Sequence, residues 1–199
     1  GNYNLYRSVL DATGPLNAGK TLLYRLSVVG QKADSFMDFA NRDVVGIRPS
    51  VTWLMGSRTT LTVDGEYFRR WTQRIPGLPA EGTVLPNING EIPRNRFSGF
   101  GDFGFNNRTL YRIGYDLTHQ FNNNWSLRNM YRFTIQEIDQ INGGILALLP
   151  DQRTATRFWG EADSISRSHL HNMVTNLTGH FTILNMDHTL LTGVELREQ

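Results

Sequence analysis

The sequence predicts an all-β fold, namely an antiparallel transmembrane β-barrel segment of about eight long strands. The first observation is the stretch 108–136, where two runs alternate apolar and polar residues with period two and are separated by Asn122–Asn124. The second is their length, close to a dozen residues each, whereas a tilted transmembrane strand needs about 9–11 and a usual strand has about 5–6. The third is that turn signals and longer connections alternate along the chain, as they do in outer-membrane barrels.

Side chains of a strand alternate between its two faces, so each run has one apolar and one charged face. The set expected to face lipid comprises Tyr111, Ile113, Tyr115, Leu117, Leu127 and Phe133. The set expected to point inward together comprises Arg112, Arg128 and Arg132. An aromatic outer face with arginines on the opposite face is typical of a membrane barrel with a polar lumen.

Four strands are expected before this hairpin. They are 4–11, 21–31, 44–55 and 59–70, with turn signals near residues 15 and 57 and a longer connection near 38. Pro49 lies inside the third strand, which would be awkward for a central strand of a soluble sheet. A loop of more than thirty residues, 71–107, follows the fourth strand, and loops of that length are usually functional or disordered.

After the hairpin we expect a connection around Gly143–Gly144 and Pro150, a long and less clearly patterned run over 154–183, a turn near 185 and a last strand over 188–197. The patterns at Gly1 and Gln199 are those of strand interiors. An open eight-stranded sheet would expose two unpaired edges in the membrane, so the sequence predicts a segment of a larger barrel.

Composition excludes several function classes. The chain has 199 residues, a net charge of +2 and no cysteine, which excludes disulfides, thiolate metal sites and a nucleic-acid-binding charge pattern. Nearly all its cations are arginines, with lysine only at Lys20 and Lys32. Arginines on the polar faces suit bidentate pairing with carboxylates inside a lumen, although compositional bias explains them equally well.

Several strings of the chain resemble the TonB-dependent siderophore receptors, especially the ferrichrome- and hydroxamate-type branch. They are YRSVLDATGPLN, RPSVTW followed by LTVDGEY, PGLPAEGTVLPNINGEIPRNRF, GYDLTHQFNNNWSLRN and NMDHTLLTGVEL. The resemblance implies a barrel of 22 strands occluded by an N-terminal plug. Residues 1–199 would then be the N-terminal portion of the barrel domain, about its first third, without the plug.

The same resemblance implies a function. The protein would be a receptor in the outer membrane of a Gram-negative bacterium that takes up a ferric siderophore, with energy from the TonB–ExbB–ExbD complex acting through the plug. It implies contacts with outer-membrane lipid, no nucleic acid, no intrinsic cofactor or metal, and no enzymatic activity. A soluble all-β module that binds carbohydrate or another ligand is the alternative, and solubility in buffer would distinguish the two.

In the family, the ligand pocket is lined by the barrel wall and the upper loops. The candidate ligand contacts here are Phe68, Arg70, Trp71, Phe97 and Phe100. The phenylalanines of the long loop, which include Phe103 and Phe105, could stack on a ligand or simply pin the loop to its neighbours. Ile75-Pro76-Gly77 and the Gly143–Leu146 stretch replace aromatic positions of the best-known members, which leaves the ligand open.

Other candidate chemistry has a structural alternative that we favour. His169 and His171 could form a metal pair, but no carboxylate completes a site, and two polar groups on a lumen or rim face are expected instead. Asp64 and Glu66 could act as an acid/base pair, but they are expected to be rungs of a lumenal salt-bridge ladder facing Arg70 and neighbouring arginines. No serine lies in a nucleophile elbow.

Overall fold

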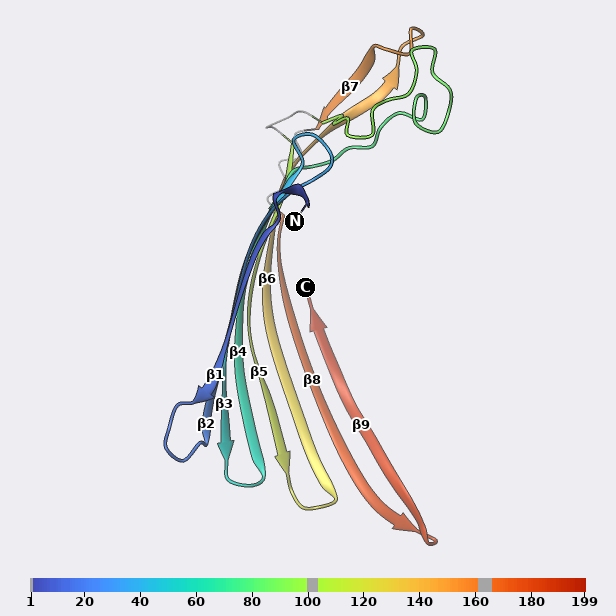
Figure 1. Cartoon of the computed structure of the whole chain (residues 1–199). Helices are drawn as coiled ribbons and strands as arrows, with labels where there is room; N and C mark the ends of the chain where they lie inside the picture. Colours follow the sequence, from blue (N-terminus) through green and yellow to red (C-terminus); the bar gives the residue numbers. More distant parts are fainter. Residues whose placement is uncertain (1, 100–103, 161–165) are drawn as a thin grey trace.

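The computed structural model describes residues 2–99, 104–160 and 166–199, and its regular secondary structure consists almost entirely of β-strands (Figure 1). After a short 3-10 turn, η1 (Asn2–Asn4), the strands are β1 (Tyr6–Pro15), β2 (Leu22–Asp34), β3 (Asn41–Met55), β4 (Thr59–Thr72), β5 (Phe105–Gln120), β6 (Trp125–Leu148), β7 (Ala155–Gly160), β8 (Ser166–Ile183) and β9 (Met186–Glu198). Within the described residues they form one antiparallel sheet of order β1-β2-β3-β4-β5-β6-β8-β9, and β7 pairs with β6. This confirms the all-β barrel-segment prediction with its eight long strands.

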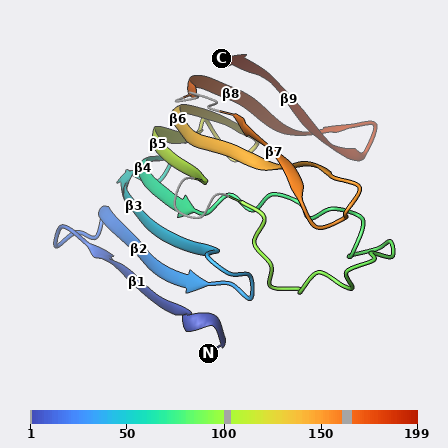
Figure 2. The same cartoon turned by 90° about the horizontal axis from the view of Figure 1, so that it is seen from above.

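The sheet is a single curved layer (Figures 1 and 2). Among the described residues, only Ala40 and Val44 are buried apolar side chains, so the segment has no core of its own. Large apolar side chains are instead exposed on the sheet, for example Trp53 at 50% and Ile113 at 58%. A soluble sandwich would pack a second sheet against this face. In the part of the chain that is described, no helix is long and apolar enough to cross a membrane.

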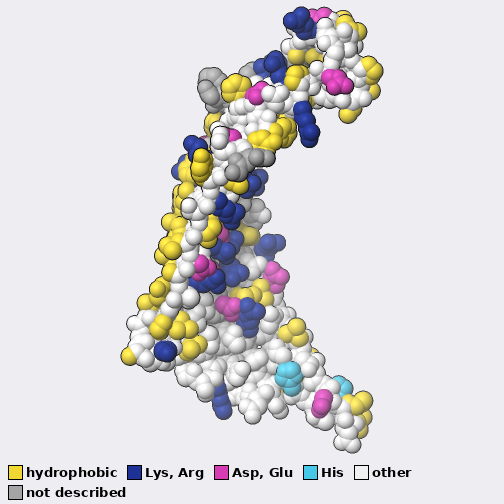
Figure 3. Space-filling model, viewed as in Figure 1, with side chains coloured by type: hydrophobic (Ala, Val, Ile, Leu, Met, Phe, Trp, Pro, Cys, Tyr) yellow, Lys and Arg dark blue, Asp and Glu magenta, His cyan; other side chains and the backbone are white. Residues whose placement is uncertain are grey.

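The pairing register segregates apolar and charged side chains onto opposite faces. Ile47 lies opposite Tyr67, Tyr67 opposite Tyr111, and Tyr111 opposite Ile135, so one apolar row crosses four strands. Because Arg112 lies between Tyr111 and Ile113 in β5, it occupies the other face. Figure 3 shows apolar side chains along the convex side of the sheet and charged side chains along the concave side. The two predicted faces of the 108–136 hairpin are confirmed.

The connections lie at two opposite ends of the strands (Figure 1). The end that we name the turn rim carries 16–21, 56–58, 121–124 and 184–185, and the opposite end, the loop rim, carries 35–40, 73–104 and 149–154. The predicted segregation is therefore confirmed. The predicted difference in length holds only in part, because 16–21 and 35–40 are equally long. The long connection between β4 and β5 accounts for most of the asymmetry.

Two expectations in the second half of the chain are wrong. β6 continues through Gly143 and Gly144 to Leu148, where a connection was expected, and its 24 residues extend about 80 Å at the usual rise of a strand. The run 154–183 is two strands, β7 and β8, and residues 161–165 lie outside the described chain. Pairing with β7 explains both errors. β7 runs back along the upper part of β6, so Gly143 and Gly144 stay in a strand, and the Phe158 ring lies beside Gly144.

Pro49 is accommodated in the interior of the sheet by its neighbour on β4. It pairs with Leu26 of β2, but the β3–β4 ladder is interrupted between Ile47 and Ser50. Proline has no amide hydrogen to donate, so such an interruption is expected. Gly65 lies next to the interruption, and a Cβ atom placed there would be 3.6 Å from the Pro49 ring.

Candidate functional site

The lower part of the concave face is a network of compensated charges. Glu66 lies 2.9 Å from Arg112 and 3.7 Å from Arg48, while Asp64 lies 3.9 Å from Arg132. Together with the Asp116–Arg128 pair of β5 and β6, these pairs join four neighbouring strands, β3 to β6. The predicted salt-bridge ladder is confirmed, but the partners of Glu66 are Arg112 and Arg48 rather than Arg70.

The residues above this ladder follow from the register. In the next row towards the loop rim, Phe68 lies between Gly46 of β3 and Leu110 of β5. Gly46 is needed there, because a Cβ atom would lie 2.9 Å from Val29 and 3.4 Å from the Phe68 ring. An apolar row thus separates the ladder from the charges nearer the rim.

The row above the apolar one is cationic. Arg70 of β4 lies opposite Val44 of β3 on one side and Arg108 of β5 on the other. Arg42 lies one row higher, opposite Thr72. A cavity of about 270 Å³ opens beside Arg42 and Arg70 and is also lined by Arg74 and Asn106 among others.

Trp71 follows Arg70 in the strand and therefore lies on the other face of the sheet. It pairs with Asp43, and the Arg69 guanidinium lies over its ring, 4.4 Å from the centroid. Phe68 and Arg70 thus share the concave face, whereas Trp71 shares the convex face with Tyr67. The structure brings together only two of the three candidates from β4.

The long loop is attached to the neighbouring connection 35–40. The Phe97 and Phe39 rings are 5.9 Å apart, and the Asn95 side chain donates hydrogen bonds to both carboxylate oxygens of Asp38 at 3.0 and 3.2 Å. The Asp38 amide in turn donates to the Asn95 carbonyl. These contacts fit the interpretation that Phe97 pins the loop. Phe100 and Phe103 lie outside the described residues.

The loop also binds the β6–β7 hairpin. The Gln152 side chain accepts a hydrogen bond from the Ile88 amide at 2.9 Å, the Asn87 side chain donates to the Gln152 carbonyl at 3.0 Å, and Asn89 donates to the Asp151 carbonyl at 2.9 Å. Arg157 of β7 donates to the Ser98 carbonyl. Loop and hairpin therefore form one hydrogen-bonded unit at the loop rim.

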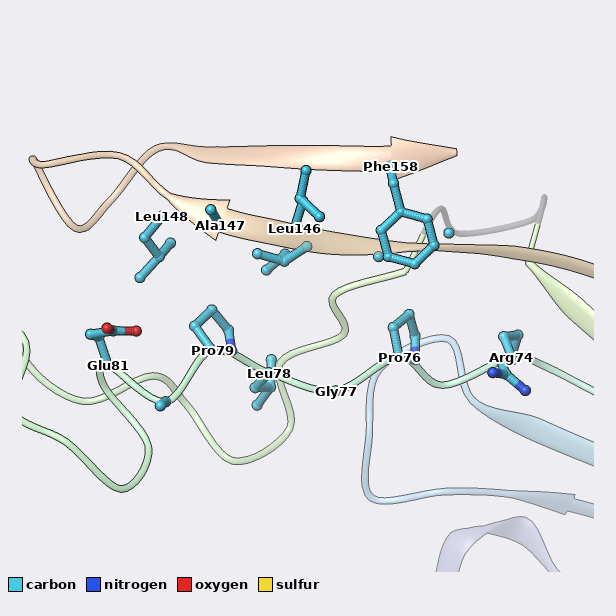
Figure 4. Close-up of a pocket in the computed structure, with 14 residues that line it drawn as sticks. Arg74, Pro76, Gly77, Leu78, Pro79, Glu81, Leu146, Ala147, Leu148 and Phe158 are labelled. Atoms are coloured by element: carbon cyan, nitrogen blue, oxygen red, sulfur yellow. The ribbon is translucent and has the colours of Figure 1, made fainter. Parts of the chain in front are cut away.

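A cleft of about 470 Å³ lies inside this unit (Figure 4). Its loop wall includes Pro76 and Pro79, and its hairpin wall includes Leu148 and Phe158, whose ring points towards Pro76 (Figure 4). The walls are mainly apolar, and Arg74 and Glu81 are the charged side chains that line it. The cleft offers shape and apolar contact rather than a reactive group.

Asp151 holds the tip of the hairpin. Its carboxylate accepts the Thr154 hydroxyl at 2.7 Å and the amides of Thr154 and Arg153 at 2.9 and 3.0 Å. The Thr154 hydroxyl above all, then these amides and the Arg153 charge, hold the Asp151 pKa below its ordinary value of 3.8. Because the pKa of Asp151 is lower in the folded state, these hydrogen bonds stabilise the hairpin tip at pH values above 3.8. That stabilisation is lost as the pH falls through the lowered pKa of the folded state.

We therefore expect the hairpin tip to loosen in acid. The amide protons of Arg153 and Thr154 should show hydrogen-exchange protection at neutral pH and lose it in acid, once the pH has fallen below the lowered pKa of Asp151, because protonated Asp151 is a poorer acceptor. Mass-spectrometric exchange of the peptide spanning 149–154 measures this. An Asp151→Ala variant should be unprotected at both values. Equal protection of the unaltered tip at both pH values would contradict the assignment.

Comparison with known proteins places these features in a family. No protein-family model matches the chain. The ferrioxamine B receptor of Salmonella typhimurium is 28% identical over 201 residues, covering all of this chain and 28% of that receptor. The metal-pseudopaline receptor CntO of Pseudomonas aeruginosa is 31% identical over 201 residues, covering 98% of this chain and 27% of the relative. The crystal structure of the ferric-catecholate import receptor Fiu of Escherichia coli K12 superposes with a TM-score of 0.81 over 97% of this chain and 29% of that chain, at 22% identity.

The chain belongs to the TonB-dependent siderophore receptors. Like the receptors it resembles, it is a piece of an outer-membrane barrel, and the proteins that it matches are named as receptors or transporters. It spans little more than a quarter of the length of these curated relatives. The convex face carries the apolar rows, and the ladder of Glu66 and Asp64 joins neighbouring strands on the concave face.

The histidine pair of this receptor segment lies on the convex side of the sheet, not on the lumen or rim face that was expected. The His171 ring lies 4.6 Å from the Phe133 ring and its Nδ1 is 2.8 Å from the Tyr131 hydroxyl, while His169 lies 6.0 Å from Phe133. Tyr131 and Phe133 also lie on the convex face, and the pairing register between β6 and β8 places the two histidines beside them. No group of three or more histidine, aspartate or glutamate residues that could hold a metal ion occurs in the described parts of the segment.

Sequence reasoning missed two members of the receptor's upper cationic row. Arg42 was assigned to a connection and Arg108 to the very start of a strand, although β3 begins at Asn41 and β5 at Phe105. The period-two pattern of Val44 and Arg48, continued by one step, would have placed Arg42 on the concave face. Only the register shows that Arg70 and Arg108 are neighbours.

Proposed function

We propose that residues 1–199 form part of the wall of an outer-membrane receptor that takes up a ferric siderophore with energy from the TonB–ExbB–ExbD complex. The observation that carries the proposal is the single-layered sheet, with one apolar convex face and one charged concave face, in a chain of this family. Such a sheet is stable only when lipid covers the convex face and a polar lumen meets the other. The similarity to receptors for ferrioxamine B and metal-pseudopaline supports a metal chelate as cargo.

We further propose that this segment is the N-terminal portion of the barrel domain and follows a plug domain. In the described residues, β1 and β9 each pair on one side only. A bare strand edge inside the bilayer leaves unpaired amides and carbonyls, which is strongly unfavourable. Further strands that complete a barrel of about 22 strands would remove both edges. The plug would provide the contact with TonB and no intrinsic cofactor would be needed.

The ligand contacts of this segment are proposed on the concave face and in the loop. Phe68 and Arg70 lie on the wall near the loop rim, and Phe97 and Phe100 belong to the loop that joins β4 and β5. Trp71 is left out because its side chain lies on the lipid-facing side, beneath Arg69.

Deletion of residues 78–99 in the full-length receptor tests this proposal. The barrel should still fold, because β4 and β5 keep the pairing that runs from Thr59–His119 to Arg70–Arg108. Uptake of radioactive iron carried by the cognate siderophore should fall about tenfold or more, since the loop closes the mouth over the ligand. Heat-modifiable migration in gels checks folding, and cells lacking TonB give the baseline.

Phe68→Ala supplies a second variant for the same assay, because it removes an aromatic wall contact without altering the loop. Its matched control is Phe181→Ala near the turn rim, where the ring stacks on His188. Uptake that persists at the unaltered level in the deletion, in the presence of a folded barrel, would show that the loop is only a cover. Uptake that persists without TonB would refute the energised mechanism.

A further inference from the structure

Three neighbouring arginines of β3, β4 and β5 near the loop rim on the concave face, Arg42, Arg70 and Arg108, are named here the arginine cluster. Within the described chain, none of the three has a side-chain hydrogen bond or an ion pair, whereas the arginines of the ladder below have acidic partners. The Nε atom of Arg70 is buried and has no partner. The cluster is therefore a concentration of uncompensated positive charge at the mouth of the receptor.

The arrangement is unfavourable for the sheet itself. Arg70 lies directly opposite Arg108 across the β4–β5 ladder, and like charges in that relation destabilise a sheet. Partial burial disfavours the Arg70 charge most, and the charges of Arg108 and then Arg42 add to that cost. A bound anion would remove this repulsion and satisfy the buried Nε of Arg70 at once.

The surroundings favour a small anion. Phe68, Leu110 and the buried Val44 lie around Arg70, so the medium beside the cluster is less polar than water and ionic contacts there are stronger. The cavity of about 270 Å³ beside Arg42 and Arg70 is also lined by Arg74, which adds a fourth cation. Guanidinium groups bind carboxylates through two parallel hydrogen bonds, which makes several arginines a selective receptor for a polycarboxylate.

The position favours cargo rather than another part of the receptor. On the concave faces of β4 and β5, the acidic side chains Asp64, Glu66 and Asp116 are already paired with arginines of the ladder below the apolar row. In the described parts of β3 to β6, the lumenal wall is thus neutralised by ion pairs below the apolar row, and the concave-face arginines without an acidic partner lie above it, towards the rim where a chelate would arrive.

We propose that the arginine cluster binds the carboxylate groups of a metal chelate with net negative charge, and that this segment thereby selects anionic over neutral and cationic siderophores. The inference rests on the proposed uptake function and adds the charge class of the substrate. It involves no covalent step. Capture is by ionic hydrogen bonds, which weaken as salt is added.

The test uses the purified full-length receptor in lipid nanodiscs and three iron chelates of different charge: anionic ferric citrate, the neutral trihydroxamate ferrichrome and cationic ferrioxamine B. Binding is followed by quenching of tryptophan fluorescence at low and high salt. The variants are Arg70→Gln, Arg108→Gln and the double variant, with Lys32→Gln as control. Lys32 lies opposite Asp43, which in turn lies opposite Trp71 on the convex face. Replacing Lys32 therefore removes one positive charge about as far from the loop rim as the cluster, but on the lipid-facing side.

The expected result is that ferric citrate binds most tightly, and that each arginine removed weakens its binding about tenfold or more, in a salt-dependent way. Lys32→Gln should leave binding unchanged. Tighter binding of ferrichrome or ferrioxamine B than of ferric citrate, unaffected by the glutamine variants, would overturn the inference while leaving uptake intact. Equal weakening of all bound chelates, or altered thermal stability with unchanged affinity, would mean that the cluster contacts the plug rather than the chelate, and would overturn the inference. No binding of any chelate would count against the proposed function itself.

Discussion

Replacing Ile113 with arginine is expected to destabilise the full-length receptor in lipid by about 2–4 kcal/mol, the cost of an arginine near the midplane of a barrel's lipid face. Ile113 lies on the convex face between Gly65 and Phe133, with 58% of its surface exposed in this segment. No acidic partner is placed beside it on that face. The guanidinium would have to reach the interface or draw water into the hydrocarbon.

The matched control is Asn172→Arg. Asn172 lies opposite Arg132, in the row next to that of Ile113 and Phe133, but on the concave face, where it donates a hydrogen bond to Glu195 at 2.8 Å. An arginine there has the Glu195 carboxylate and a polar lumen beside it but lies opposite Arg132 and Arg197, so we expect a loss of about 1 kcal/mol or less. Unfolding by denaturant in lipid vesicles measures both variants. Equal destabilisation of the two would mean that the faces have been assigned wrongly.

Replacing Glu66 with glutamine should cost about 3–5 kcal/mol, as expected when one partner of a buried ion pair is removed. The Glu66 side chain is only 15% exposed and that of Arg112 is 29% exposed, so solvent screens this pair weakly. Arg48 is mostly exposed and contributes little to the cost. The loss comes mainly from Arg112, whose charge would remain on a crowded wall without its carboxylate.

The charge ladder predicts a specific recovery. A double variant, Glu66→Gln with Arg112→Met, should regain much of the stability, because the orphaned charge is gone. Glu195→Gln, in which an exposed carboxylate near the sheet edge is neutralised, should change stability by only about 0.5 kcal/mol and serves as the control. Denaturant midpoints of the unaltered receptor, the two single variants Glu66→Gln and Arg112→Met, and the double variant give the coupling energy. A coupling energy near zero would show that the Glu66–Arg112 contact is incidental.

Most of the strand pattern could be predicted from the sequence, since period-two alternation is a local property. The hairpin formed by β5 and β6 is the clearest case: Tyr111 to Leu117 and Leu127 to Ile135 specify both the strands and their faces. The end of β6 could not be predicted in this way. Gly143 and Gly144 are turn signals locally, but pairing with β7 and the ring of Phe158 keep them in a strand.

The candidate site was predictable only in its broad location. Arg70 and Phe68 were found because they share the polar face of one strand near its end. Trp71 was included with them although alternation puts it on the other face, where Arg69 covers its ring. The loop's role as part of one unit with the hairpin depends on Gln152 and Asp151, which are far from it in sequence.

The sequence by itself determined the class of the molecule. Strand length and alternation depend only on residues that are neighbours along the chain, and the absence of cysteine follows from the composition. Tertiary structure alone decided which charges meet. Glu66 pairs with Arg112 rather than Arg70, and Arg70 lies against Arg108, because register between strands sets these distances. A shift of one residue in that register would exchange the two faces, and neither the ladder nor the arginine cluster would then exist.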